Sequence, residues 1–135
     1  MADRDPIFGL LPRTLAGPLA AAQFFAVLAA EAVEVAAFVY LGADQELLGI
    51  RHIRSAWADM LDVPIREIVS DALAFGAMGM VVAHNHPGGD PTPSSADRDV
   101  TKRLVRALEP LGIRLHDHLV VAREGTVSFR TLGLL

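Results

Sequence analysis

Ala83-His84-Asn85-His86-Pro87-Gly88-Gly89-Asp90-Pro91-Thr92-Pro93-Ser94-Ser95-Ala96-Asp97 is the stretch that decides the interpretation of this sequence. It begins at the end of residues 78–83, a short apolar run that contains adjacent valines and is bounded by turn residues. Such a run is typical of a buried strand. Side chains two positions apart on a strand share a face. We therefore expect His84 and His86 to point the same way, where the strand runs out into a loop.

The loop leads from these histidines to the start of a helix. Residues 87–93 are rich in proline and glycine and cannot lie inside a helix or a strand. Ser94 is a favourable helix N-cap, and Asp97 follows it by three residues. Two neutral imidazoles and one carboxylate form a three-ligand set for zinc, which leaves the fourth position to water.

Each part of this pattern also has a simpler explanation. Ser94 and Asp97 fit the first turn of a helix, where an acid interacts favourably with the helix dipole. A single histidine in a loop is more often a hydrogen-bonded side chain than a metal ligand. For each of these residues considered alone, the simpler explanation and the role at a metal site both remain open.

Taken together, the residues resemble a known motif. A His-x-His at a strand end, then seven residues, then Ser-x-x-Asp is similar to the JAMM motif of the JAB/MPN metallopeptidases. The surrounding letters resemble the RadC-like bacterial branch of these proteins. Gly88 departs from that branch, which usually has serine at this position, and the position is not a ligand.

The resemblance implies a zinc-dependent hydrolase that cleaves an amide, peptide or isopeptide bond with a metal-activated water. It implies that the zinc ligands are His84, His86 and Asp97. It also implies that Ser94 donates a hydrogen bond to the oxyanion of the tetrahedral intermediate.

The resemblance also implies a general base. In the RadC-like branch this is a glutamate just before the first strand of a hairpin that lies earlier in the chain than the two histidines. Glu34 occupies that place in this sequence. Glu31 lies about one helical turn earlier and is the rival candidate, although it more simply lies in the connection to the strand.

Composition limits the classes of function. The chain has 135 residues, of which 52% are hydrophobic, and this suits one domain with one core. A formal charge of −4 leaves no global basic field to hold phosphates. The absence of cysteine excludes disulfides, thiolate zinc sites and cysteine nucleophiles, and it is compatible with the cytoplasm, where we expect the protein to be.

The other apolar patterns predict an α/β fold. Residues 14–30 fall just short of a membrane span and predict a buried helix of about 12–14 residues, so we expect no membrane partner. Strand–helix–strand order predicts a sheet packed against helices. The resemblance specifies a JAB/MPN-type mixed β-sheet flanked by helices, with cytidine deaminase-like layering. The predicted strands are 35–41, 46–53, 78–83, 113–121 and 126–130, the predicted helices are 64–75 and 96–108, and residues 51–63, with Trp57, are expected to be irregular.

We expect a single domain over residues 1–135, in which residues 1–13 form a loosely ordered start. The resemblance covers roughly residues 31–135. RadC-like proteins often carry an N-terminal helix-hairpin-helix region, and we expect none in this chain.

A second group of polar residues is His116-Asp117-His118. Strand alternation would place both histidines on one face. They could hold a second metal, but the resemblance favours a role for residues 117–120 as sheet and wall of the site. Four cations near one helix face are more simply a solvated surface than a phosphate site; they are Arg98, Lys102, Arg103 and Arg106.

The expected partner is a peptide or protein substrate, and a homo-oligomer is possible. Nucleic acid is possible but weakly supported by the charge. The main alternative is a DNA-repair-associated or interaction module whose metal site is structural or vestigial.

Overall fold

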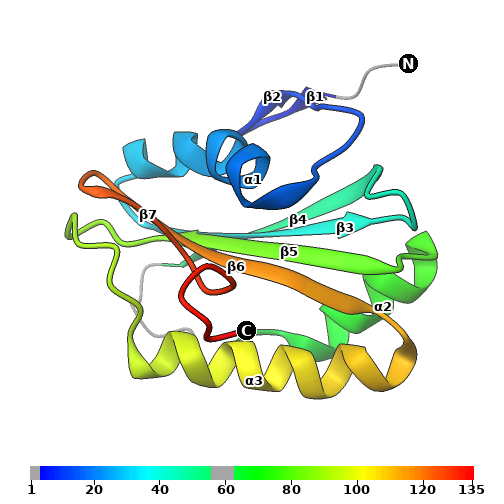
Figure 1. The fold of residues 1–135 in the computed structure, drawn as a ribbon. Helices are drawn as coiled ribbons and strands as arrows, with labels where there is room; N and C mark the ends of the chain where they lie inside the picture. Colours follow the sequence, from blue (N-terminus) through cyan, green and yellow to red (C-terminus); the bar gives the residue numbers. More distant parts are fainter. Residues whose placement is uncertain (1–3, 56–62) are drawn as a thin grey trace.

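The computed structural model describes residues 4–55 and 63–135, so Trp57 lies outside the described part. Its main feature is a five-stranded mixed sheet in the order β4-β3-β5-β6-β7 (Figure 1). This architecture confirms the predicted α/β fold. The helices are α1 (Gly17–Phe25), η1 (3₁₀, Ala26–Ala30), α2 (Ile65–Phe75), α3 (Ser95–Leu108) and η3 (3₁₀, Glu109–Leu111), and the strands are β1 (Arg4–Asp5), β2 (Gly9–Leu10), β3 (Glu34–Leu41), β4 (Leu47–Ser55), β5 (Gly79–Asn85), β6 (Arg114–Ala122) and β7 (Gly125–Ser128).

The direction of the strands brings the motif together. β3 runs antiparallel to both β4 and β5, β5 runs parallel to β6, and β6 runs antiparallel to β7. A parallel pair needs a crossover connection, which α3 provides between β5 and β6. The chain therefore leaves β5 through the proline- and glycine-rich loop, and α3 begins beside the end of the sheet where β5 stops (Figure 1).

Helices cover both faces of the sheet. α1 lies on one face, and α2 and α3 lie on the other (Figure 1). Alternate residues of β3 enter two separate cores: Val35 packs in a cluster with Phe25 of α1, and Phe38 packs in a cluster with Leu104 of α3. A strand that is buried on both faces reads as a continuous apolar run, which explains the sequence of β3.

The structure differs from the expected elements at three places. Residues 14–30 contain the nine-residue helix α1 followed by the 3₁₀ helix η1, and not one helix of about 12–14 residues. Residues 4–10, expected to be loose, contain the ribbon β1–β2, and Phe8 stacks on Phe24 of α1 with ring centroids 4.5 Å apart. β4 continues through residues 51–55, which were expected to be irregular, because it pairs with β3 as far as Glu34. Within the described residues, no helix is both long and apolar enough to cross a membrane.

Asn85, the residue between the two histidines, holds the backbone at the start of β3. Its Oδ1 accepts a hydrogen bond from the N–H of Val35 at 2.6 Å, and its Nδ2 donates to the carbonyl oxygens of Glu31 at 3.2 Å and Val33 at 3.0 Å. Asn85 is only 1% exposed, so water cannot replace these bonds. The strand that carries the histidines thereby fixes the chain on both sides of Glu34.

We predict that Asn85→Ala lowers the free energy of unfolding by about 2–4 kcal/mol, because it leaves buried backbone groups without partners. Urea denaturation followed by circular dichroism measures the change. Ser70→Ala, at an exposed position of α2, is the control and should change stability by less than about 0.5 kcal/mol. Equal stability of the two variants would mean that Asn85 does not hold this connection.

Candidate metal centre

Two histidines and one carboxylate converge where β5 ends and α3 begins. Nε2 of His84 lies 2.9 Å from Oδ1 of Asp97 and 3.2 Å from Nε2 of His86. Nε2 of His86 lies 3.1 Å from Oδ2 of Asp97. Among the described residues, this is the one group of three or more histidine and acidic side chains whose potential ligand atoms lie within 4.8 Å of one another. The structure thus brings together the three residues expected to be ligands.

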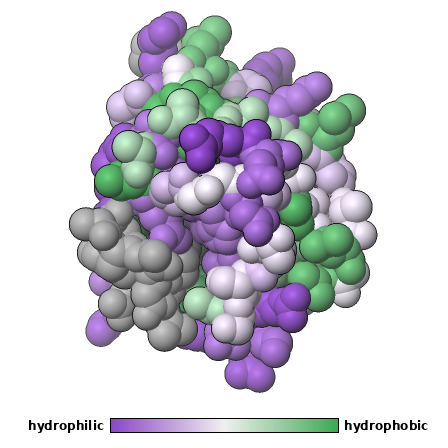
Figure 2. Space-filling model, turned by 90° about the vertical axis from the view of Figure 1, so that its left-hand side faces the viewer, coloured by the Kyte–Doolittle hydropathy of each residue, from purple (hydrophilic) through white to green (hydrophobic). Residues whose placement is uncertain are grey.

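Most of this group is shielded from water. His84 is 0% exposed and Asp97 is 2% exposed, whereas the side chain of His86 retains 22% of its exposure. The surrounding end of the molecule carries the loop after β5 and the β6–β7 turn, and hydrophilic residues gather in the middle of that face (Figures 1 and 2). Access from solvent is therefore on the side of His86.

Asp97 takes part in the helix cap and in the histidine cluster at the same time. Its N–H donates to Oγ of Ser94 at 3.1 Å, and its Oδ2 accepts from the N–H of Ser94 at 2.8 Å, which forms a capping box. Burial raises the pKa of Asp97, but hydrogen bonds and charges from His84 and His86, together with the Ser94 N–H, outweigh it and hold the pKa well below its usual range. The carboxylate is therefore ionised, and the capping box aims it at the histidines.

The loop after β5 sets the orientation of His86. Its Nδ1 lies 2.9 Å from the carbonyl oxygen of Asp90, which can only accept a hydrogen bond, so Nδ1 carries the hydrogen. In the neutral ring, Nε2 then presents its lone pair to Asp97. Gly89 makes this loop possible, because its φ of 100° suits glycine and its N–H donates to the carbonyl of His86 at 3.0 Å.

A series of hydrogen bonds sets the orientation of His84. The hydroxyl of Thr101 donates to the carbonyl oxygen of Asp97 at 2.9 Å, and this uses its one hydrogen. Nδ1 of His118, 2.7 Å from the same hydroxyl, must therefore donate to it. Burial lowers the pKa of His118 well below the ordinary value, so its ring is neutral and its Nε2 accepts from Nδ1 of His84 at 2.8 Å.

The consequence of both arrangements is the same. Each histidine holds its hydrogen on Nδ1 and turns the lone pair of Nε2 towards the carboxylate. Lone pairs this close repel one another unless a proton or a metal ion lies among them. Ligating histidines are commonly oriented in this way by a hydrogen bond at the other ring nitrogen.

The resemblance placed His118 in the wall of the site, but neither its bond to His84 nor the part of Thr101 was recognised from the sequence. The alternation expected for residues 116–118 is wrong, because β6 contains a bulge: Met80 pairs with Leu115 and Val81 pairs with Asp117. His116 is the extra residue. It lines a cavity beside α1, whereas His118 on the other face contacts Thr101 of α3.

Asp117 has a structural role in the described part of the chain. Its Oδ1 accepts from the N–H of His118 at 2.8 Å and of Arg130 at 3.0 Å, and its Oδ2 accepts from Oγ of Ser128 at 2.6 Å. It therefore joins β6 to the end of β7 and the turn beyond it.

The two candidate glutamates lie in different surroundings. Ala36 of β3 is the direct partner of His84, and Glu34, two residues earlier, lies on the same face of the sheet. Glu34 is 7% exposed, and its charge helps to raise the pKa of His86. Glu31 instead forms an ion pair with Arg54 of β4 at 2.6 Å.

Two further positions of the loop were singled out by the sequence resemblance. Ser94 is exposed, and its hydroxyl accepts from Asp97 while its hydrogen is still able to donate. Gly88, the departure from the RadC-like branch, is also exposed, and a Cβ added there would meet nothing within 4 Å. No steric contact in this structure therefore requires glycine at position 88.

A mixed sheet flanked by helices, with a His-x-His at the end of one strand and an aspartate in the first turn of the next helix, is the arrangement of a JAB/MPN-type domain. The chain belongs to the RadC-like JAB domain family, whose sequence model matches residues 15–134. This match confirms the resemblance stated for the motif.

Three proteins illustrate the relationship. The chain is 41% identical over 97 residues to UPF0758 protein YfjY of Escherichia coli (strain K12), covering 72% of this chain and 61% of that protein. It is 39% identical over 122 residues to UPF0758 protein XAC3915 of Xanthomonas axonopodis pv. citri (strain 306), covering 90% and 54%. It is 38% identical over 122 residues to UPF0758 protein STH371 of Symbiobacterium thermophilum, covering 90% and 52%. The matched region thus spans little more than half of each relative.

We predict that Thr101→Val lowers the affinity for a metal ion about 10- to 100-fold, because it removes the hydroxyl that fixes the tautomers of His118 and His84. Competition between the protein and a chromophoric chelator for Zn²⁺ measures the affinity. Thr101→Ser keeps the hydroxyl and should retain most of the affinity. Equal losses in both variants would show that packing at Thr101 matters and the hydroxyl does not.

We also predict a pH dependence of Zn²⁺ binding. The hydrogen bond with Asp97 is the largest of the effects that raise the pKa of His86, so protons compete for its Nε2 up to a higher pH than for an ordinary histidine. The affinity should therefore increase with pH and level off only above about 6.5, the ordinary histidine pKa. The same chelator competition at a series of pH values tests this, and an affinity already constant below that pH would contradict it.

Proposed function

We propose that the protein is a zinc-dependent hydrolase that cleaves an amide, peptide or isopeptide bond in a peptide or protein substrate. The observation that carries the proposal is the convergence of two imidazoles and one carboxylate: the two Nε2 atoms lie 3.2 Å apart, and the two oxygens of Asp97 lie 2.9 Å from one and 3.1 Å from the other. Tetrahedral zinc bound at about 2.0–2.1 Å would separate its ligand atoms by about 3.3 Å. The group therefore fits zinc with small adjustments and leaves one position open.

The donor set also favours zinc over harder cations. Two imidazoles and one carboxylate suit zinc, whereas magnesium and calcium take oxygen ligands almost entirely. His84, His86 and Asp97 would hold the ion. Zinc bound there would supply a Lewis acid that lowers the pKa of a water towards neutrality, which makes hydroxide available at physiological pH.

Glu34 is the proposed proton acceptor and donor. Its carboxylate lies on the face of the sheet that carries the two histidines, and it needs only to reach the attacking water at about 2.6–3.2 Å. As the water oxygen bonds to the carbonyl carbon, Glu34 takes its proton. Glu34 then passes that proton to the nitrogen as the carbon–nitrogen bond breaks.

Ser94 is the proposed oxyanion donor. The substrate carbonyl oxygen gains negative charge in the tetrahedral intermediate, and a fixed hydroxyl hydrogen stabilises that charge. The bond from the N–H of Asp97 holds Oγ of Ser94 at 3.1 Å and leaves its hydrogen able to donate outwards. The helix cap thus presents the hydroxyl beside the histidine cluster.

The alternative is an interaction or DNA-repair-associated module with a structural metal. A purely structural zinc site is normally closed by a fourth protein ligand. In the described residues, the metal-ligand group contains three residues, which favours a site with an open position. Zinc binding without hydrolysis of any peptide or isopeptide substrate would support the alternative.

We predict that Glu34→Gln keeps about one zinc per chain but removes nearly all hydrolysis. The amide preserves shape and cannot accept the proton, and loss of a general base costs about 10²- to 10⁴-fold in turnover. The protein would be screened against peptide and isopeptide substrates, and its zinc content measured by elemental analysis. His84→Ala, by contrast, should lose the zinc itself.

Glu31→Gln is the matched control for this experiment, because Glu31 pairs with Arg54 and should leave turnover within about twofold. If Glu31→Gln loses turnover and Glu34→Gln keeps it, the two roles are reversed. Full turnover in both variants would rule out a glutamate base from this segment.

For Ser94→Ala we predict two separate losses. Removal of the cap should lower the free energy of unfolding by about 1 kcal/mol. Removal of the oxyanion donor should lower kcat about a hundredfold. Ser94→Asp retains a capping side chain without a hydroxyl hydrogen, so it should restore stability and not turnover; normal turnover in Ser94→Ala would leave only the capping role.

A further inference from the structure

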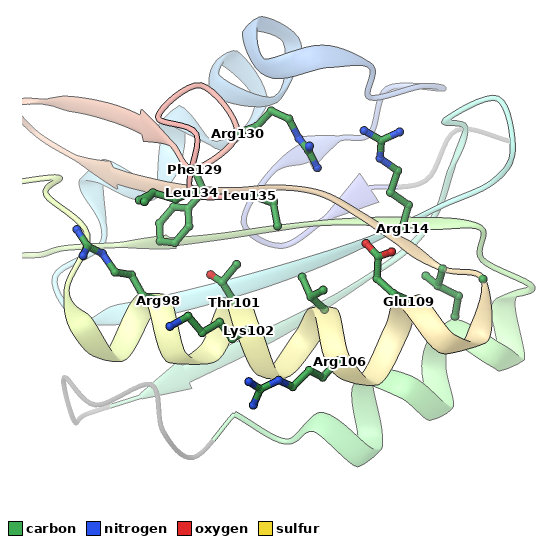
Figure 3. Close-up of a pocket in the computed structure, with 13 residues that line it drawn as sticks. Arg98, Thr101, Lys102, Arg106, Glu109, Arg114, Phe129, Arg130, Leu134 and Leu135 are labelled. Atoms are coloured by element: carbon green, nitrogen blue, oxygen red, sulfur yellow. The ribbon is translucent and has the colours of Figure 1, made fainter.

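A groove lies between α3 and the turn that follows β7 (Figure 3). Its volume is about 960 Å³. Val105 and Leu135 in its lining are half-buried and Leu134 is exposed, so they supply apolar surface over Phe129 and Ile113, which are almost completely buried. The groove lies on the far side of His118 and Thr101 from the metal-ligand group, and it is separate from the proposed active site.

Cationic side chains gather along this groove. α3 contributes Arg98, Lys102 and Arg106 (Figure 3). The start of β6 contributes Arg114, whose side chain points away from α3, and the turn after β7 contributes Arg130; both also line the cavity beside α1. Glu109 is the one acidic side chain among the lining residues. The whole chain holds 12 lysines and arginines against 16 acidic residues. Five of the 12 cations and only one of the 16 acids line one groove, so positive charge is concentrated there on an otherwise acidic protein.

Four of these cations lack an acidic partner. Within the described residues, no ion pair includes the side chain of Arg98, Lys102, Arg106 or Arg114. Arg130 differs from these four because its guanidinium has backbone partners: it donates to the carbonyl oxygens of His116 at 2.9 Å and Leu115 at 3.1 Å. A solvated face would more commonly mix charges of both signs, as the rest of this chain does.

The spacing of the cations matches an extended polypeptide. Arg98, Lys102 and Arg106 are four residues apart on one helix, and this places successive side chains about 6 Å apart along its axis. Alternate side chains of an extended chain repeat at about 6.6–6.8 Å. An extended segment in the groove would therefore meet one cation at every second residue and turn the intervening side chains towards the apolar surface of the groove.

Nucleic acid fits the groove less well. Single strands are held by aromatic side chains on which bases stack. Phe129, the one aromatic residue in the lining, is 1% exposed and already stacks on His118 with ring centroids 4.5 Å apart. The net charge of −4 would also repel a long polyanion beyond the groove.

We propose that this groove binds an extended segment of a partner polypeptide in which acidic and apolar residues alternate. The acidic side chains would pair with the cations of α3, and the apolar ones would cover Val105, Leu134 and Leu135. This binding site goes beyond the proposed hydrolase and does not depend on it, because no metal ligand lines the groove.

Fluorescence anisotropy at physiological ionic strength tests the proposal with three labelled probes. They are the peptide Glu-Leu-Glu-Leu-Glu-Leu, the peptide Glu-Glu-Glu-Leu-Leu-Leu of the same composition, and hexathymidylate. We expect the alternating peptide to bind the most tightly. Reversal of two charges in Lys102→Glu/Arg106→Glu should weaken it at least about tenfold, since each exposed pair contributes a fraction of a kcal/mol and reversal adds repulsion.

Arg13→Glu/Arg66→Glu is the control, since it makes the same change of net charge at two exposed positions outside the groove. It should keep the affinity, and both double variants should keep the Zn²⁺ affinity of the unmodified protein, which checks folding. Equal binding of the two peptides, equal losses in both double variants, tighter binding of hexathymidylate, or no binding of any probe would each overturn the proposal. So would self-association that occupies the groove and is lost in Lys102→Glu/Arg106→Glu.

Discussion

The constraint on which the site depends is electrostatic: two imidazoles and one carboxylate, all bearing lone pairs, are held within hydrogen-bond distance of one another. Nε2 of His84, Nε2 of His86 and the carboxylate of Asp97 cannot remain together without positive charge between them. The surrounding structure prevents them from moving apart. Asp97 is fixed by the helix cap, His86 by a backbone carbonyl, and His84 by a buried neighbour.

The fold produces this constraint through two connections. The parallel pairing of β5 with β6 requires the crossover through α3, so the first turn of that helix lies beside the end of β5. The antiparallel pairing of β3 with β5 places Glu34 on the face that carries the histidines, and Asn85 fixes the chain on both sides of it. The groove on the far side of His118 differs from the metal-ligand group in charge and exposure, because most of its charged side chains are cations in contact with solvent.

Much of this arrangement could be predicted from the sequence, because it depends on local patterns. The valine-containing run before His84, the prolines and glycines of the loop, and the Ser94 cap specify a strand, a loop and a helix start without tertiary information. The bulge in β6 could not be predicted, since His116-Asp117-His118 satisfies simple alternation. The series from Asp97 through Thr101 to His118 could not be predicted either, because its last bond joins Thr101 of α3 to His118 of β6, which are 17 positions apart.

The proposed zinc site has two histidine ligands, and X-ray absorption spectroscopy at the zinc edge can detect them in protein that carries one zinc per chain. Zinc held by His84, His86, Asp97 and one water should give a four-coordinate shell of nitrogen and oxygen at about 2.0–2.1 Å, with outer-shell scattering from two imidazoles. His86→Ala should reduce that scattering to one imidazole. A spectrum with no imidazole scattering, or one that His86→Ala leaves unchanged, would rule out zinc binding by this pair of histidines.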